Sequence, residues 1–171
     1  MAREDSLPEF LRKWGNELQT KRAKLESAVA ADEFKDIFTN TREAIAKVRS
    51  TRTKLKTRLE KEKQNRALEG NTLKYAKQVI SDHIPALDTK LNRLDIFLNG
   101  IKTHGQADVA AISLVSDEIS ERLAAIMSSI DGLHATVDDL RVALAHRQQS
   151  AATERREGVH AQIWQRRRSS A

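Results

Sequence analysis

The stretch that decides the fold is residues 112–144, ISLVSDEISERLAAIMSSIDGLHATVDDLRVAL. Apolar side chains recur in it at nine consecutive steps of three or four residues, from Ile112 to Leu144. Side chains at this spacing lie on one face of an α-helix, so the stretch predicts one long amphipathic helix. Its apolar stripe needs neighbouring helices to cover it, which favours a helical bundle. Gly132 falls inside this helix, where it indicates the close approach of a neighbour.

Two more helices are predicted before it. The first runs from Leu7 to about Ala30, and Ser6 is its N-cap. A break is predicted near Asp32, and the second helix then runs from Phe34 to about Glu69, where Gly70 fits the residue after a helix end. If the chain stays helical through Asp32 instead, three long helices replace four.

A third helix, capped by Asn71, is predicted to end at 99–100. Pro85 lies inside its apolar stripe. Because proline removes a backbone donor and crowds the preceding turn, we expect a kink or a short break near 81–84. A loop is predicted at 103–108, around Gly105.

The composition supports an all-α fold. The 171 residues include 6 Gly, 2 Pro and no Cys, so turn-forming residues are scarce and β or α/β folds are disfavoured. We expect an elongated antiparallel bundle of about four long helices with coiled-coil-like packing over 1–150, and a basic amphipathic tail at 151–171. Trp14 and Phe10 are expected in the core. No secretory signal or spanning segment is recognisable and Cys is absent, so a cytoplasmic location is expected.

The positive charge is concentrated in one part of the second helix. The formal net charge is +6, and no acidic residue interrupts 45–58, which holds Lys47, Arg49, Arg52, Lys54, Lys56 and Arg58. One interpretation is a solvated face, or a face paired with acidic residues of the last helix, such as Asp117, Glu118, Glu121, Asp131, Asp138 and Asp139. The other is a surface for polyanions, held through backbone phosphates because aromatic residues are absent nearby.

An apolar seam runs between these basic residues. It includes Leu55 and Leu59. Because the second and fourth helices are predicted to be longer than the other two, we expect this seam to stay uncovered and to bind a second subunit or a partner helix.

The tail is a second candidate for binding partners. It combines apolar residues with a run of arginines, a composition suited to a docking peptide, an interfacial segment or phosphate contacts. The alternative is that its apolar residues fold back onto the bundle. The residues concerned are Val159, Ile163, Trp164, Arg166, Arg167 and Arg168.

No pattern of catalysis or cofactor binding is recognisable. The six glycines are isolated, so no phosphate-binding loop is predicted. Asp131, His134 and Asp138 share one helical face, but they lack the second copy that a di-metal bundle needs. We therefore expect no metal, cofactor or small-molecule substrate, and a histidine held by ion pairs or hydrogen bonds.

Three functions follow in order of preference. The first is a non-enzymatic structural or adaptor protein that binds protein partners and forms a homo-oligomer through helix packing. The second is nucleic-acid binding or packaging through the basic residues. The third is binding to an anionic membrane by a long, kinked bundle, which resembles the BAR-type scheme in outline only: long helices, positive charge and Pro85.

Overall fold

The protein is a bundle of long helices. The computed structural model describes the backbone of residues 4–104 and 109–169 and the side chains of residues 4–101 and 114–149. All regular elements in these ranges are helical, which confirms the predicted all-α class. They are α1 (Leu7–Ser27), a 3-10 turn η1 (Ala28–Ala30), α2 (Phe34–Gln64), α3 (Gly70–Gln78), a π-helical turn η2 (Val79–His83), α4 (Ile84–His104) and α5 (Val109–Ser169).

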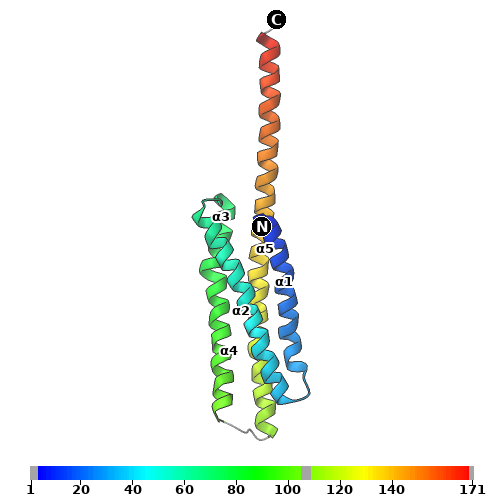
Figure 1. Ribbon diagram of the computed structural model, residues 1–171, viewed down its shortest axis with the longest axis vertical. Coiled ribbons are helices and arrows are strands. Elements are labelled where there is room, and N and C mark those ends of the chain that lie inside the picture. Colours follow the sequence, from blue (N-terminus) through cyan, green and yellow to red (C-terminus); the bar gives the residue numbers. More distant parts are fainter. Residues whose placement is uncertain (1–3, 105–108, 170–171) are drawn as a thin grey trace.

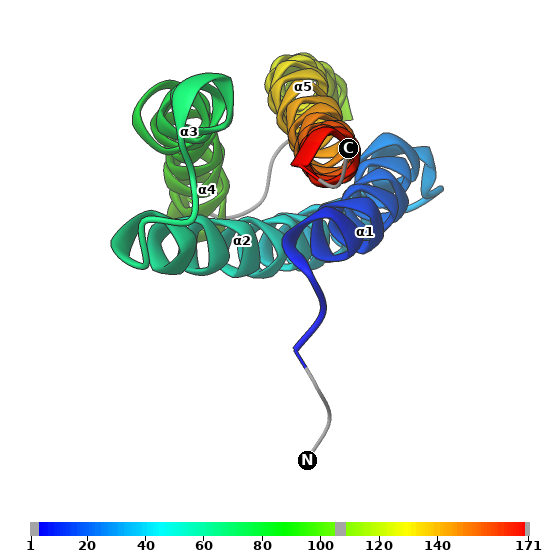
Figure 2. The ribbon, with the colours of Figure 1, turned by 90° about the horizontal axis from the view of Figure 1, so that it is seen from above.

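These elements form four rods around a common core. The chain descends along α1, ascends along α2, descends through α3 and α4, and ascends along α5 (Figure 1). Seen from above, α1 lies beside α2 and α5, and the α3–α4 rod closes the ring on the other side (Figure 2). The predicted stripe of α5 faces the interior, where Ile119, Leu123, Ile126, Ile130, Leu133, Val137, Leu140 and Leu144 are buried.

The break between the first two helices lies where the sequence predicts it. Ser6 caps α1, with its Oγ accepting a hydrogen bond from the Glu9 backbone N–H at 3.4 Å. The chain then leaves the helical conformation at Ala31, whose ψ is 145°. Four rods, not three, therefore make up the bundle.

The turn between α2 and α3 differs from the prediction. α2 ends at Gln64, before the predicted Glu69, and Leu68 in the connection is 4% exposed. Burial of Leu68 in the core explains the early end, because a helix continuing past Gln64 would carry the chain away from the bundle.

Gly70 begins the next helix instead of following the previous one. It is the first residue of α3 and has φ +55°, a conformation that glycine adopts without steric cost. The N-cap is Glu69, not Asn71, and the Glu69 backbone N–H donates to Thr72 Oγ1 at 2.9 Å. The hydroxyl of Thr72, three residues beyond the N-cap, therefore stabilises the start of α3. A search for N-cap residues alone does not detect this contact.

Pro85 bends the third rod as predicted. The backbone N–H of Ile84 donates to the carbonyl of Val79, five residues back, and this wider π turn accommodates the proline ring. α4 then continues to His104, past the predicted end at 99–100. Of the predicted loop at 103–108, residues 105–108 lie outside those that the structure describes.

The rod lengths differ from the expected pattern. α2, with 31 residues, is longer than α1, with 21, as predicted, but the α3–α4 rod, Gly70–His104, runs the length of α2. α5 extends furthest: its backbone stays helical to Ser169 and continues beyond the bundle, in the part of the chain predicted to be a tethered basic amphipathic tail (Figure 1). The side chains of 150–171 lie outside the described residues, so the interactions of Val159, Ile163, Trp164, Arg166, Arg167 and Arg168 stay predictions.

Candidate interaction surfaces

Two arginines of the basic stretch join α2 to α4. The Arg49 guanidinium pairs with the Asp95 carboxylate and donates to Asn92 Oδ1 at 2.9 Å. The Arg52 guanidinium forms a two-point contact with the Asp88 carboxylate, with Nε to Oδ1 at 2.7 Å. Asp88 and Asp95 are seven residues apart and so lie on one face of α4. These arginines therefore hold the two helices together.

Two lysines of the stretch are also paired. Lys54 Nζ lies 2.9 Å from Glu17 Oε1 of α1, and Lys47 Nζ lies 2.9 Å from Glu43 Oε1 of its own helix. The hydrogen bond and charge of Lys54 lower the pKa of Glu17, since both favour the carboxylate. For Lys56, the structure shows no hydrogen bond or ion pair with any described residue.

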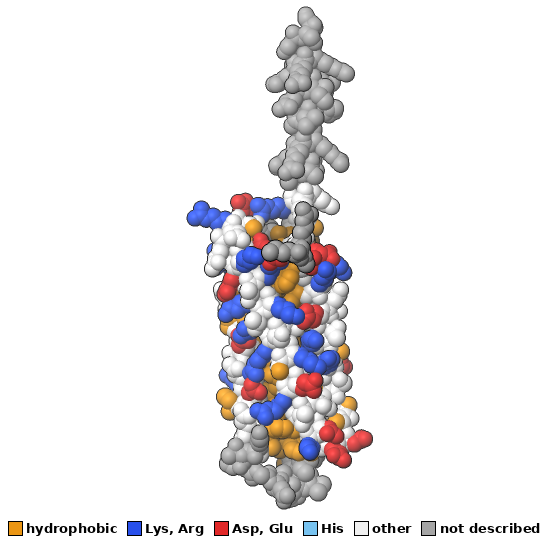
Figure 3. Space-filling view, viewed as in Figure 1, with side chains coloured by type: hydrophobic (Ala, Val, Ile, Leu, Met, Phe, Trp, Pro, Cys, Tyr) orange, Lys and Arg blue, Asp and Glu red, His pale blue; other side chains and the backbone are white. Residues whose placement is uncertain are grey.

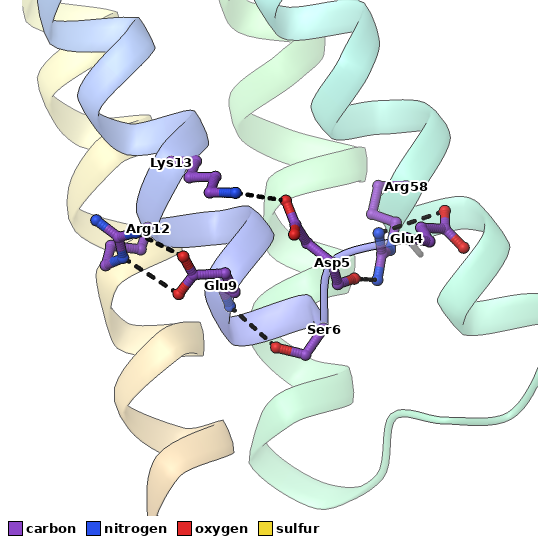
Figure 4. Close-up of polar contacts among 7 residues, drawn as sticks. All are labelled: Glu4, Asp5, Ser6, Glu9, Arg12, Lys13 and Arg58. Carbon is purple, nitrogen blue, oxygen red and sulfur yellow. Dashed lines mark hydrogen bonds and ion pairs between the residues drawn. The ribbon is translucent and has the colours of Figure 1, made fainter. Parts of the chain in front are cut away.

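Arg58 is tied to the segment that precedes α1. Its side chain is 9% exposed, and its Nη2 donates to the Asp5 carbonyl at 2.7 Å (Figure 4). Its Nε donates to the Glu62 carboxylate at 2.8 Å. The Glu4 carboxylate lies 3.3 Å from Arg58 Nη1 and 2.7 Å from Lys61 Nζ. The hydrogen bond and charge of Lys61 lower the pKa of Glu4. Arg58 is thus a structural residue with little surface to offer a polyanion.

Further contacts fix the same segment. Lys13 Nζ lies 3.0 Å from Asp5 Oδ2 (Figure 4). Next to this contact, within α1, Arg12 pairs with Glu9 (Figure 4). The hydrogen bond from Arg12 lowers the pKa of Glu9. Residues 4–6 are therefore held over the end of α2 by charges of both signs.

The basic stretch is mostly paired with carboxylates. Five of its six cations have an acidic partner, and in Figure 3 the blue and red side chains alternate over this face. Charge pairing was predicted, but the predicted partner helix is wrong. α2 and α5 lie on opposite sides of the ring, so the acidic residues of α5 reach α1 instead: Arg22 Nε and Nη2 lie 2.8 and 3.1 Å from the carboxylate oxygens of Asp131.

The expected exposed seam does not exist. Leu55 and Leu59 are both 0% exposed and belong to the single core of the described residues. α1 covers this part of α2, because Trp14 is 2% exposed and its Nε1–H donates to the Thr51 carbonyl at 2.7 Å, one turn from Leu55. Phe10 is partly buried against the same core, as expected. Leu55 and Leu59 are therefore packing residues with no surface for a partner.

A groove of about 490 Å³ lies between α1 and α5. Its floor is apolar, from buried Leu18 and Ile130, and exposed Ala23 and Ala135 lie beside them. Its polar and charged lining includes Arg22, Glu26, Asp131, His134 and Asp138. This groove contains the three residues whose shared face the sequence analysis noted. Asp131 binds Arg22, and His134 Nδ1 lies 3.8 Å from Asp138 Oδ2. Among the described side chains, no group of three or more His, Asp or Glu could hold a metal ion.

Two histidines lie over glycines in this part of the bundle. A Cβ added to Gly15 would lie 3.3 Å from His134 Nε2, and a Cβ added to Gly132 would lie 3.8 Å from the His83 ring. His83, from the π turn, is 2.8 Å from Thr136 Oγ1. The missing Cβ at Gly15 makes room for the His134 ring. At Gly132, where a close approach was predicted, the His83 ring lies nearby, but a Cβ would meet it only at ordinary van der Waals distance.

Large hydrophobic side chains are exposed at three described positions. Ile96 on α4 is 71% exposed, and on α5 Leu114 is 71% and Val142 58% exposed. Leu114 and Val142 are a whole number of heptads apart, so they lie along one outward face of α5.

Comparisons with known proteins give no assignment. No family model, no curated protein and no solved structure matches the chain. No helix in the described part of the chain is long and apolar enough to cross a membrane. The function must therefore be argued from the surfaces themselves.

Proposed function

We propose that the chain is a non-enzymatic structural or adaptor protein that acts through helix–helix contacts with protein partners, including further copies of itself. The observation that carries the proposal is the continuation of α5 as a helix to Ser169, beyond the end of the bundle. The other rods provide a base that fixes the direction of this helix.

The exposure of α5 where it leaves the bundle supports a role in binding other proteins. Among the side chains that the structure describes, Leu144 is the last buried one, and 145–149 are all exposed. An isolated helix gains little stability from its backbone alone and depends on packing of an apolar face. Beyond this point the sequence still supplies apolar residues, Val159, Ile163 and Trp164, together with Arg166, Arg167 and Arg168. A helix of this composition would be stabilised by packing against another helix.

The finer features of the proposal are coiled-coil-like antiparallel packing, a basic C-terminal segment, oligomerisation and a cytoplasmic location. The 3-4 spacing of the α5 core residues supports the first, and the arginines of 155–168 support the second. Ion pairing of the α2 cations favours a protein partner over a polyanion, because bound carboxylates compete with phosphates for the same groups.

The experiment is affinity capture with the full chain, after nuclease treatment, compared with the double variant Ile163→Ala/Trp164→Ala. We expect the wild-type chain to retain a defined set of proteins and the variant to lose them. A variant at exposed Ile96, Ile96→Ala, is the matched control and should retain them. If the double variant retains the same proteins as the wild type, the projecting helix is not the interaction element.

A further inference from the structure

We propose that the groove between α1 and α5, with the outer face of α5 beside it, binds the projecting α5 helix of a second copy of this chain. This inference rests on the proposed function and names the partner for the same helix. The product is a symmetric dimer in which each copy provides one groove and one projecting helix.

The groove has the shape and chemistry to receive a helix. Its floor is made of the branched apolar side chains of Leu18 and Ile130, with the exposed small side chains of Ala23 and Ala135 beside them, and its volume is about 490 Å³. Asp131 and Asp138 stand at its edge with side chains 58% and 50% exposed. A helix that carries apolar and basic residues can place the first on the floor and the second against the carboxylates.

The outer face of α5 continues this surface along the helix. Ala124, Ser128 and Ala135 are exposed small residues on this face, and Val142 is 58% exposed. Small side chains allow a second helix to approach closely, and Val142 supplies an apolar contact near the point where α5 leaves the bundle. Within one copy, no described helix covers this face.

The charges of the two surfaces are opposite. Residues 121–139 contain four acidic residues and one arginine, whereas 151–169 contain five arginines and two glutamates. Glu121 and Asp139 are exposed and form no ion pair or hydrogen bond with any described residue. The acidic surface therefore has unpaired carboxylates available for the basic helix of another copy.

An antiparallel pair of α5 helices brings these surfaces together. A two-fold axis near Ala145 places residues 150–169 of one copy along residues 121–140 of the other. In this register, Arg155, Arg156 and Val159 lie along the groove residues of the second copy. The two helices overlap over residues 121–169, or about 70 Å at ~1.5 Å per residue. Because such a contact is the same on both copies, it closes as a dimer and does not propagate.

A charge-swap experiment tests the pairing. One variant is Asp138→Arg/Asp139→Arg, and the other is Arg155→Glu/Arg156→Glu. The matched control is Asp32→Arg/Glu60→Arg, which reverses two exposed carboxylates away from the groove. Each chain is measured by size-exclusion chromatography with light scattering at low salt, and circular dichroism checks that it is folded.

We expect the wild type and the control to have about twice the chain mass of 19.3 kDa. Each variant alone should dimerise at least about tenfold more weakly, because like charges then face each other in both halves of the interface. An equimolar mixture of the two variants should recover the dimer, since both halves then carry opposite charges. The proposal is overturned if the folded variants each dimerise as strongly as the wild type. It is also overturned if an equimolar mixture of the two folded variants does not form the dimer.

A second measurement keeps the test decisive if a charge variant unfolds. The chain has no Cys, so Ala145→Cys introduces a single thiol near the proposed axis, and oxidation should link two copies. Ala86→Cys, exposed on α4, should not link. If neither thiol links and the wild type is a monomer, the dimer is excluded. The proposed function still stands if Ile163→Ala/Trp164→Ala then loses the captured proteins.

Discussion

Replacing Leu55 by alanine distinguishes a packed core position from an exposed seam. Leu55 is 0% exposed, and the change removes three carbon atoms from the interior. At ~0.8 kcal/mol per buried methylene the transfer loss is about 2.4 kcal/mol, and the cavity left behind raises the total to ~3–5 kcal/mol. An exposed seam residue would instead change the free energy of unfolding by about 0.5 kcal/mol or less.

The assay is urea denaturation of Leu55→Ala followed by circular dichroism, with Ile96→Ala as the control. Ile96 is 71% exposed on α4, away from the proposed dimer surface, so the control should unfold close to the wild type. We expect the Leu55→Ala midpoint to fall sharply with an unchanged slope. If Leu55→Ala is nearly as stable as the wild type but loses self-association, Leu55 lies at an interface and the packing described for α2 is wrong.

Three further changes test the account. Gly70→Ala should lower the free energy of unfolding by about 1–2 kcal/mol in the same urea assay, because its Cβ would meet nothing within 4 Å and only the φ of +55° is unfavourable. A double-mutant cycle of Arg52→Ala and Asp88→Ala should give a coupling of ~1 kcal/mol, since this partly exposed pair joins two helices; a coupling of zero would show that it does not hold α2 to α4. Glu17→Gln should flatten the acid side of the pH–stability curve. Its pKa is lowered from 4.5 by Lys54, so its contribution is present above that value and is lost as pH falls through the folded pKa. Melting temperatures measured from pH 2 to 7 check the direction, and an unchanged acid slope would contradict it.

Structural features that depend on periodicity and on local residues could be predicted from the sequence. The stripe from Ile119 to Leu144 is buried along its whole length, and the break near Asp32 and the bend before Pro85 occur where local chemistry requires them. These features depend on spacing within one segment and on the missing N–H of proline. They do not depend on which helices are neighbours.

Features that depend on which helices pack against each other could not be predicted from the spacing within one segment. Leu55 and Leu59 were expected to be exposed because the second and fourth helices were predicted to be longer than the other two. In the structure the leucines face the core, while Arg49 and Arg52 beside them pair with α4. The sequence shows both the basic and the acidic residues, but the order of the helices around the bundle decides which of them form ion pairs.

The groove also required the fold. The shared face of Asp131, His134 and Asp138 could be read from the sequence, but its position opposite α1 could not. Gly15 was one available signal, because a Cβ there would lie only 3.3 Å from His134 Nε2. The signal is not general in this bundle: Gly132 lies against His83 at ordinary contact distance, and a Cβ at Gly100 inside α4 would meet nothing within 4 Å.

The most direct test of the central claim is light scattering on the freshly purified full chain, with absorbance recorded at 260 and 280 nm at low and high salt. The claim is that the protein works through helix–helix contacts with proteins and that its α2 cations are already paired. It predicts a homo-oligomer at low salt and a protein-like absorbance ratio at both salt concentrations. A raised absorbance at 260 nm at low salt that disappears at high salt would contradict it, because the cations would then be bound to nucleic-acid phosphates.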